Sequence, residues 1–144
     1  MERLEGYADI LLEHHGVSEN DVLFVISNSG VNAVPVEMAL GAKRIGAKVI
    51  ALTSLKHSRQ MHPRHSSGKK LFEIADLVLD NCGVYGDAAV ELDQYPIMVG
   101  PTSTIAGALI INAITVQIAK NYEKSGKEPP VFVSANVALA GSEG

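Results

Sequence analysis

The most informative segment of this chain is Val22-Leu23-Phe24-Val25-Ile26-Ser27-Asn28-Ser29-Gly30. Its five consecutive apolar residues predict a strand that is buried on both faces, as strands of parallel sheets usually are. The hydroxyl, amide and glycine residues that follow would then lie at the carboxyl end of this strand, where open α/β sheets bind their ligands. The segment therefore predicts a ligand site that begins at Ser27.

A helix and a second strand follow this segment. The helix is expected from about Ala33 to Ile45, with Pro35 in its first turn, where a missing N–H costs nothing. The apolar run Val49-Ile50-Ala51-Leu52 predicts the second strand. Two buried strands joined by one helix form a right-handed parallel βαβ unit, so Thr53 and Ser54 should share a sheet edge with the first turn.

The rest of the chain supplies further elements of one α/β domain. Helices are expected near residues 3–14, 71–75 and 103–124, a third strand at 77–79 and a late edge strand at 129–134. Residues 80–101 lack strong periodicity, and residues 56–70 read as a polar loop. No linker or repeat divides the chain, so we expect a single domain over residues 1–144 with a thin parallel sheet.

Bulk composition narrows the possible functions. The 144 residues are 47% hydrophobic, which is enough to bury a core, and the formal charge of −4 argues against nucleic acid or an anionic membrane as partner. A single cysteine, Cys82, rules out an internal disulfide framework, and the first residues do not resemble a secretory signal. We expect a cytoplasmic protein.

The helix expected at 103–124 is apolar nearly all round. Its most apolar part, Ile105 to Ala119, is shorter than the roughly 20 residues that a membrane span needs, and it carries polar residues such as Asn112 and Gln117. We therefore predict a buried helix, covered by the sheet and by a partner helix from a second copy of the chain. A homodimer or a higher homo-oligomer is expected.

Positive charge is concentrated in one part of the sequence. Eight of the twelve Lys and Arg residues lie between Lys43 and Lys70, where no Asp or Glu occurs. Since this window follows the Ser27 turn, it favours an anion site, and phosphate is the natural candidate. The loop around His65 and Lys69 is either a solvated loop or a lid that closes over an anionic substrate.

The residues predicted to bind the ligand come from three places. The first turn offers Ser27, Asn28, Ser29, Gly30 and Asn32 at a helix N-terminus, whose free N–H groups attract anions. The second strand ends in Thr53 and Ser54, and the long helix begins with Ser103 and Thr104, which could contact sugar hydroxyls. Ordinary helix capping is the alternative explanation for each group.

Catalytic groups are harder to assign. Glu37 and His65 are the candidates for proton transfer, although each could simply face solvent. Neighbouring cations, the absence of a nearby thiol or carboxylate and the spacing of the histidines argue against a metal site. No Gly-x-Gly-x-x-Gly or P-loop pattern is present, so no nucleotide cofactor is expected.

Together these motifs resemble the SIS (sugar isomerase) domain family. The match comprises the Ser27-Asn28-Ser29-Gly30 turn after a buried strand, the strand ending Thr53-Ser54 and the Ser103-Thr104 helix start; the runs 64–71, 100–104 and 130–136 resemble an uncharacterised bacterial subgroup. The resemblance implies a flavodoxin-like αβα fold, oligomers and binding of phosphorylated sugars. It also implies that Ser27, Ser29 and Asn32 hold phosphate, although Asn32 is often Thr in the family.

Family members normally begin with a helix and a strand that this chain does not show, so it resembles the carboxyl-terminal two thirds of such a domain. The function implied is phosphosugar binding, as an aldose–ketose isomerase or as a non-catalytic sensor. Turnover would distinguish the two.

Overall fold

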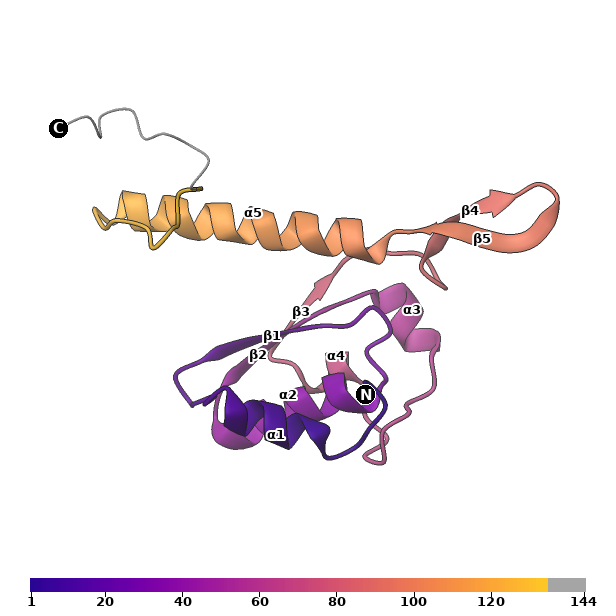
Figure 1. Cartoon of the computed structure of the whole chain (residues 1–144), viewed down its shortest axis with the longest axis horizontal. Coiled ribbons are helices and arrows are strands. Elements are labelled where there is room, and N and C mark those ends of the chain that lie inside the picture. Colours follow the sequence, from indigo (N-terminus) through magenta and orange to yellow (C-terminus); the bar gives the residue numbers. More distant parts are fainter. Residues whose placement is uncertain (135–144) are drawn as a thin grey trace. The chain divides into compact units, whose positions relative to one another are not determined.

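The computed structural model describes residues 1–134 (Figure 1). In chain order the elements are α1 (Tyr7–His14), β1 (Val22–Ile26), α2 (Ala33–Ile45), β2 (Lys48–Thr53), α3 (Leu55–Gln60), α4 (Leu71–Ile74), β3 (Leu77–Asp80), β4 (Ala88–Leu92), β5 (Tyr95–Pro101) and α5 (Ser103–Lys124). The contacts divide the chain into two compact units, Met1–Ala108 and a second that begins at Leu109. The single domain expected over residues 1–144 stays a prediction.

The first unit is built on a parallel sheet of three strands in the order β1-β2-β3. Phe24 pairs with Ile50, and Ile50 pairs with Leu77, which fixes the register across all three strands. The predicted α/β class is therefore confirmed. Because the strands are parallel, their carboxyl ends lie at one edge of the sheet, and the residues that follow them meet there.

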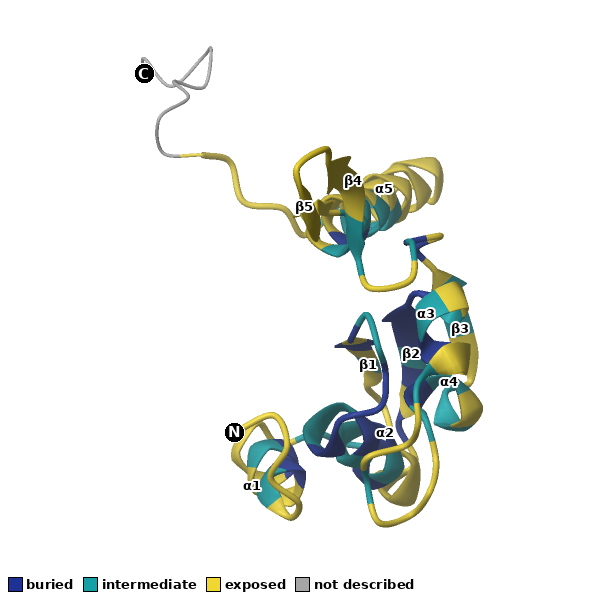
Figure 2. Ribbon diagram, turned by 90° about the vertical axis from the view of Figure 1, so that its right-hand side faces the viewer, coloured by how far each residue is buried: buried dark blue, intermediate teal, exposed yellow. Residues whose placement is uncertain are grey.

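Helices cover one face of this sheet. Figure 2 shows α1 and α2 on that side, with buried residues along β2 and along the facing surface of α2. The core cluster consists of Leu12, Val25, Ala39, Ala42, Ala47, Val49, Ala51 and Leu71. Small side chains on α2 let the helices approach closely, and a Cβ at Gly41 would lie only 2.3 Å from Leu12 Cδ1 of α1.

The opposite face of β1 is exposed, contrary to the prediction of a strand buried on both faces. Val25 is buried against the helices, whereas Val22, Phe24 and Ile26 point to the other face and remain 56%, 36% and 57% exposed. Successive side chains of a strand point to opposite faces of the sheet. Because helices cover only one face of β1, exposed residues alternate with less exposed ones along this strand. The continuous apolar run correctly predicted a strand, but it wrongly predicted that both faces of this strand are buried.

Three segments differ from the sequence predictions. Residues 80–101, which lack periodicity, contain the antiparallel hairpin β4–β5. The polar stretch expected to be a loop begins with α3, whose Ser54 side chain caps it by accepting from the His57 N–H. The late strand predicted at 129–134 is wrong for these residues, which form no strand; two prolines, Pro129 and Pro130, remove backbone donors there.

Helix α5 has the predicted bounds, and most of its residues are exposed in the single chain. Among its described residues only Gly107 is buried, while Ile105 and Leu109 are 74% and 69% exposed. The helix has 22 residues and contains an 18-residue window with a mean hydropathy of 1.3, so by length and composition alone it could cross a membrane, as core helices of soluble proteins also could. The cover that we expect from the sheet and from a second copy of the chain stays a prediction.

Candidate functional site

The turn after β1 is closely packed around Gly30. This residue has φ +61°, in the left-handed region, and its N–H donates to Ser27 Oγ at 3.2 Å. A Cβ at this position would lie 3.2 Å from Ser58 Oγ and 3.3 Å from Thr53 Oγ1. Glycine is therefore required both by the backbone conformation and by the space available.

Thr53 and Ser54 are fully buried behind this turn. Thr53 Oγ1 donates to the Asn28 carbonyl at 3.0 Å, and Ser54 Oγ donates to the Gly83 carbonyl at 2.7 Å. Each hydroxyl proton already has a backbone acceptor, so these side chains tie the loops of the sheet edge together. Their role as phosphate ligands stays a prediction.

A cavity of about 200 Å³ opens at the sheet edge. Its lining consists of Ile26, Asn28, Leu52, Asn81, Ser103 and Thr104. The structure thus brings three predicted site residues from distant segments to one place. Asn81 was missed in the sequence, although its position directly after β3 was a usable signal; its Nδ2 donates to Asn28 Oδ1 at 3.0 Å.

The start of α5 is held by an acidic cap that the sequence did not reveal. Asp87 Oδ1 accepts from the Ser103 N–H at 2.8 Å and from the Thr102 N–H at 3.1 Å, and Asp87 Oδ2 accepts from Ser103 Oγ at 2.7 Å. Burial disfavours the charged form of Asp87 and so raises its pKa, but the hydrogen bonds from Ser103 and Thr102 favour the charged form more strongly. The pKa of Asp87 therefore lies below its ordinary value of 3.8. Ser103 is thereby fixed at the cavity wall.

Residues 1–6 contact the N-terminus of α2. Glu2 Oε1 accepts from Asn32 Nδ2 at 2.7 Å, and the Glu2 carbonyl accepts from the Val34 N–H at 3.0 Å. On the other side, Arg64 donates to Asn32 Oδ1 at 3.1 Å. A carboxylate thus lies beside a helix N-terminus and near a guanidinium group, surroundings that favour anions.

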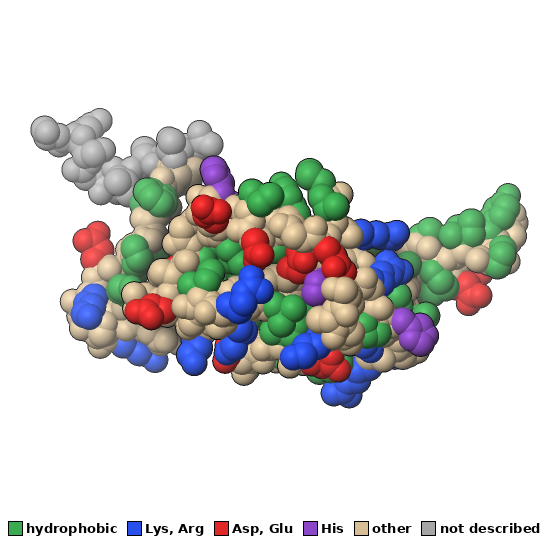
Figure 3. Space-filling model, turned by 90° about the horizontal axis from the view of Figure 1, so that it is seen from below, with side chains coloured by type: hydrophobic (Ala, Val, Ile, Leu, Met, Phe, Trp, Pro, Cys, Tyr) green, Lys and Arg blue, Asp and Glu red, His purple; other side chains and the backbone are tan. Residues whose placement is uncertain are grey.

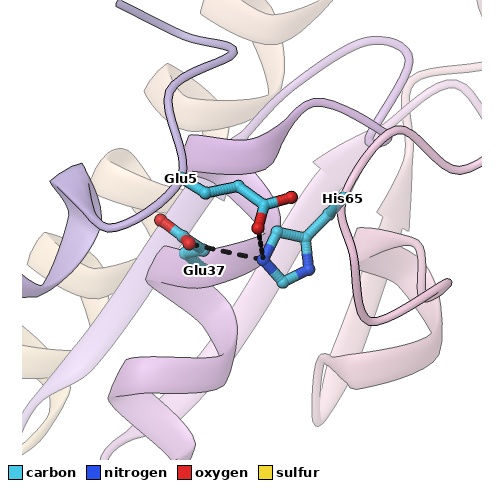
Figure 4. Close-up of side chains that lie close together, drawn as sticks. All are labelled: Glu5, Glu37 and His65. Atoms are coloured by element: carbon cyan, nitrogen blue, oxygen red, sulfur yellow. Dashed lines mark hydrogen bonds and ion pairs between the residues drawn. The ribbon is translucent and has the colours of Figure 1, made fainter.

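The two predicted catalytic candidates lie side by side (Figure 4). His65 Nε2 is 3.3 Å from Glu37 Oε1 and 3.8 Å from Glu5 Oε2. The side chains of His65 and Glu37 are only 9% and 16% exposed, whereas that of Glu5 is 44% exposed. Spacing alone could not place Glu5 there, because it is separated from His65 by sixty residues of chain.

Each member of this cluster is held in place by further hydrogen bonds. The Gly6 N–H donates to both oxygens of Glu37 at 2.8 and 2.9 Å. Glu5 accepts from the N–H and the hydroxyl of Ser66, and mainly for this reason the pKa of Glu5 lies below its ordinary value. His65 Nδ1 lies 2.8 Å from Ser67 Oγ.

Basic and acidic residues are mixed on one face of the molecule. Figure 3 shows Lys and Arg side chains interspersed with Asp and Glu on the face that it presents. Lys43 and Arg44 form ion pairs with Asp76 and Asp9. Lys69 is exposed, its backbone N–H donates to Ser67 Oγ, and its role in phosphate binding stays a prediction.

The resemblance to SIS domains implied an α/β fold with a parallel sheet, in which the first strand ends in Ser-x-Ser-Gly at a polar edge. The structure has this arrangement. A family model described as "SIS domain" matches residues 1–54. This match spans β1, the turn, α2 and β2, the segment that carries the resemblance.

Curated relatives cover more of the chain. It is 50% identical to a UPF0309 protein of Shouchella clausii over 137 residues, 48% identical to one of Oceanobacillus iheyensis and 40% identical to one of Geobacillus thermodenitrificans. These alignments cover 95% of this chain but only 55–56% of the relatives, so the chain spans just over half their length. The resemblance to SIS domains, and to an uncharacterised bacterial subgroup of them, is confirmed.

Proposed function

We propose that this chain binds a phosphorylated sugar at the carboxyl edge of its parallel sheet. The observation that carries the proposal is the cavity in which Asn28, Asn81, Ser103 and Thr104 meet. Hydroxyl and amide side chains on an apolar floor of Ile26 and Leu52 suit a ligand with many hydroxyl groups. The match to SIS domains supports a phosphosugar in particular.

In this proposal the phosphate lies against the turn from Ser27 to Asn32. The N-terminus of α2 and the guanidinium of Arg64 favour a negative group there. Ser29 is half-buried, and Gly30 lets a ligand approach the backbone. The Glu2 carboxylate now beside Asn32 would have to move before phosphate reached that amide.

The finer proposal is aldose–ketose isomerisation. That reaction needs a base to move a proton between C1 and C2 and a donor for the oxyanion of the enediolate intermediate. Glu37 and His65 supply a carboxylate and an imidazole 3.3 Å apart, largely withdrawn from solvent. They are the acid–base pair that we assign to this step.

The experiment is calorimetric titration of the 144-residue chain with a panel of sugar phosphates, with inorganic phosphate and the unphosphorylated sugars as controls. A bound sugar phosphate should also raise the melting temperature by mass action. Ser29→Ala and Thr104→Ala should weaken binding, whereas Ser125→Ala, one residue beyond the end of α5, should not. Absence of binding by every sugar phosphate contradicts the proposal.

The sugar that binds is then tested for conversion to its keto or aldo isomer. Glu37→Gln should abolish turnover and leave binding intact. Binding without turnover in the unsubstituted chain would instead support the alternative function, a non-catalytic phosphosugar sensor.

A further inference from the structure

We propose that Glu5, Glu37 and His65 form a binding site for a divalent transition-metal ion of the zinc type. One ligand atom from each residue lies within 4.8 Å of the others. The three side chains come from residues 1–6, from α2 and from the loop before α4, so the fold rather than local sequence brings them together. The inference does not depend on phosphosugar binding. It does compete with the acid–base role assigned above to Glu37 and His65, because a bound metal would occupy the Oε1 and Nε2 atoms that would otherwise transfer a proton.

The separations match the geometry of such a site. In tetrahedral coordination with bonds of about 2.0–2.2 Å, neighbouring ligand atoms lie roughly 3.3–3.6 Å apart. His65 Nε2 is 3.3 Å from Glu37 Oε1 and 3.8 Å from Glu5 Oε2. A small movement of the more exposed Glu5 side chain would therefore complete three bonds.

Charge at this cluster also favours a divalent cation. Two carboxylates face one imidazole, so even a protonated His65 balances only one of the two negative charges. Arg64, the adjacent cation in sequence, donates to Asn32 instead. Burial of unbalanced charge is costly, and Glu37 is only 16% exposed, so a dication would neutralise the pair more completely than a proton does.

Hydrogen bonds around the cluster hold the ligands in position. Backbone N–H groups of Gly6 and Ser66 donate to the two carboxylates. His65 Nδ1 now accepts from the Ser67 N–H at 3.2 Å and lies 2.8 Å from Ser67 Oγ. With a metal at Nε2, the imidazole proton would move to Nδ1 and donate to Ser67 Oγ, and the Ser67 N–H would give up its bond to Nδ1. Metal-bound histidines usually make such a second hydrogen bond.

The ligand set indicates the class of metal. One imidazole nitrogen with carboxylate oxygens suits Zn²⁺ or Mn²⁺, whereas Mg²⁺ and Ca²⁺ prefer oxygen ligands alone. Three protein ligands leave a fourth position open to water, as in catalytic rather than structural zinc sites. Glu5, the most exposed of the three, lies on the side of the cluster that solvent reaches.

The test uses the metal alone, without any sugar. The full 144-residue chain carries Cys82→Ser throughout, because the exposed thiol could itself bind zinc. Metal-stripped protein is titrated with Zn²⁺ and separately with Mg²⁺, by calorimetry and by thermal shift. We expect saturable binding of one Zn²⁺ per chain, a rise in melting temperature by mass action and no comparable effect of Mg²⁺.

Variants identify the site. Glu37→Gln, Glu5→Gln and His65→Asn should each weaken Zn²⁺ binding by at least about tenfold, since each removes a direct ligand, and even second-shell changes cost roughly 10–100-fold. His62→Ala, which removes an exposed histidine of the same loop, should bind as the parent does. Glutamine keeps an oxygen that can accept the Ser66 or Gly6 hydrogen bond, so the glutamine variants should fold even if His65→Asn does not.

No zinc binding by the parent chain would overturn the inference, and so would unchanged binding in both glutamine variants. Neither result would decide whether the chain binds a phosphosugar, because the titration with sugar phosphates tests that proposal separately.

Discussion

Gly30 is the residue at which the sheet edge tolerates least change. A left-handed φ costs roughly 1–2 kcal/mol for any residue with a Cβ, and the neighbours of Gly30 add crowding that costs roughly 1–3 kcal/mol more. Gly16 provides a matched control, because it has φ +62° but no atom within 4 Å of the place that a Cβ would occupy.

We therefore expect Gly30→Ala to lower the free energy of unfolding by more than Gly16→Ala. Urea denaturation of both variants measures the difference. Equal losses would show that the turn relaxes and that the contacts with Ser58 and Thr53 do not constrain it.

Asp87 gives a prediction about pH. It has φ +73°, which asparagine also tolerates, so Asp87→Asn removes the charge with little backbone strain. Folding lowers the pKa of the Asp87 carboxyl below its ordinary value of 3.8. The carboxylate therefore stabilises the folded protein at pH values above 3.8, and this stabilisation is lost as the pH falls through the pKa of the folded state.

At neutral pH we expect Asp87→Asn to cost about 0.5–1 kcal/mol, the usual size of a charge effect at a helix N-terminus. Urea titrations at pH 7 and at pH 3 should show the gap between parent and variant narrowing in acid. A gap of constant size would contradict this account of the cap.

At the scale of elements, Glu2 links residues 1–6 to α2. Its carboxylate should repel a phosphate that approaches the same helix N-terminus. Glu2→Gln keeps an acceptor for Asn32 and removes the charge, so we expect the affinity for a sugar phosphate to rise several-fold, equivalent to about 0.5–1 kcal/mol. Glu13→Gln, an exposed change in α1, is the control, and equal affinities in calorimetry would contradict the prediction.

Most elements could be predicted from the sequence, because their signals are local. The apolar run of β1, the Pro35 start and Gly46 end of α2 and the hydroxyl start of α5 each act within a few residues of the element they define. The bounds of α2 and α5 agree with prediction for this reason. The hairpin β4–β5 was missed because its strands are exposed and lack a clean alternation.

The site was only partly predictable. Asn28 follows β1, so parallel topology predicted its place at the sheet edge. Ser103 and Thr104 were expected there only if the start of α5 lay over that edge, and the structure places them in the same cavity. Glu37 was identified by its type and its place one turn into α2, and His65 by its type and its place in the basic segment. Nothing local showed that they would touch or that Glu5 would join them. These contacts depend on how residues 1–6 and the loop before α4 pass over α2. The periodicity of apolar residues carries no information about such crossings.

For the whole molecule, the exposed apolar residues of α5 carry the prediction of self-association. Leu109 is 69% exposed, and burying such a side chain is worth roughly 1.5–3 kcal/mol. We expect light scattering to give a mass that is a multiple of the 15.3 kDa chain and to fall towards a single chain in Leu109→Glu.

Leu4→Glu, at a residue 58% exposed outside α5, should leave the mass unchanged. A monomeric parent that instead partitions into lipid vesicles would contradict self-association and favour a membrane role for α5.

The contacts of residues 1–6 also have a practical consequence. Within six residues of Met1, the chain contacts Asn32, Ser66 and Glu37. Any polypeptide joined ahead of Met1, whether an affinity tag or a native extension, would emerge directly beside the proposed sugar and metal ligands. Assays should therefore compare amino-terminal and carboxyl-terminal tags, because trimming or fusion at the front could alter both binding activities without a single substitution.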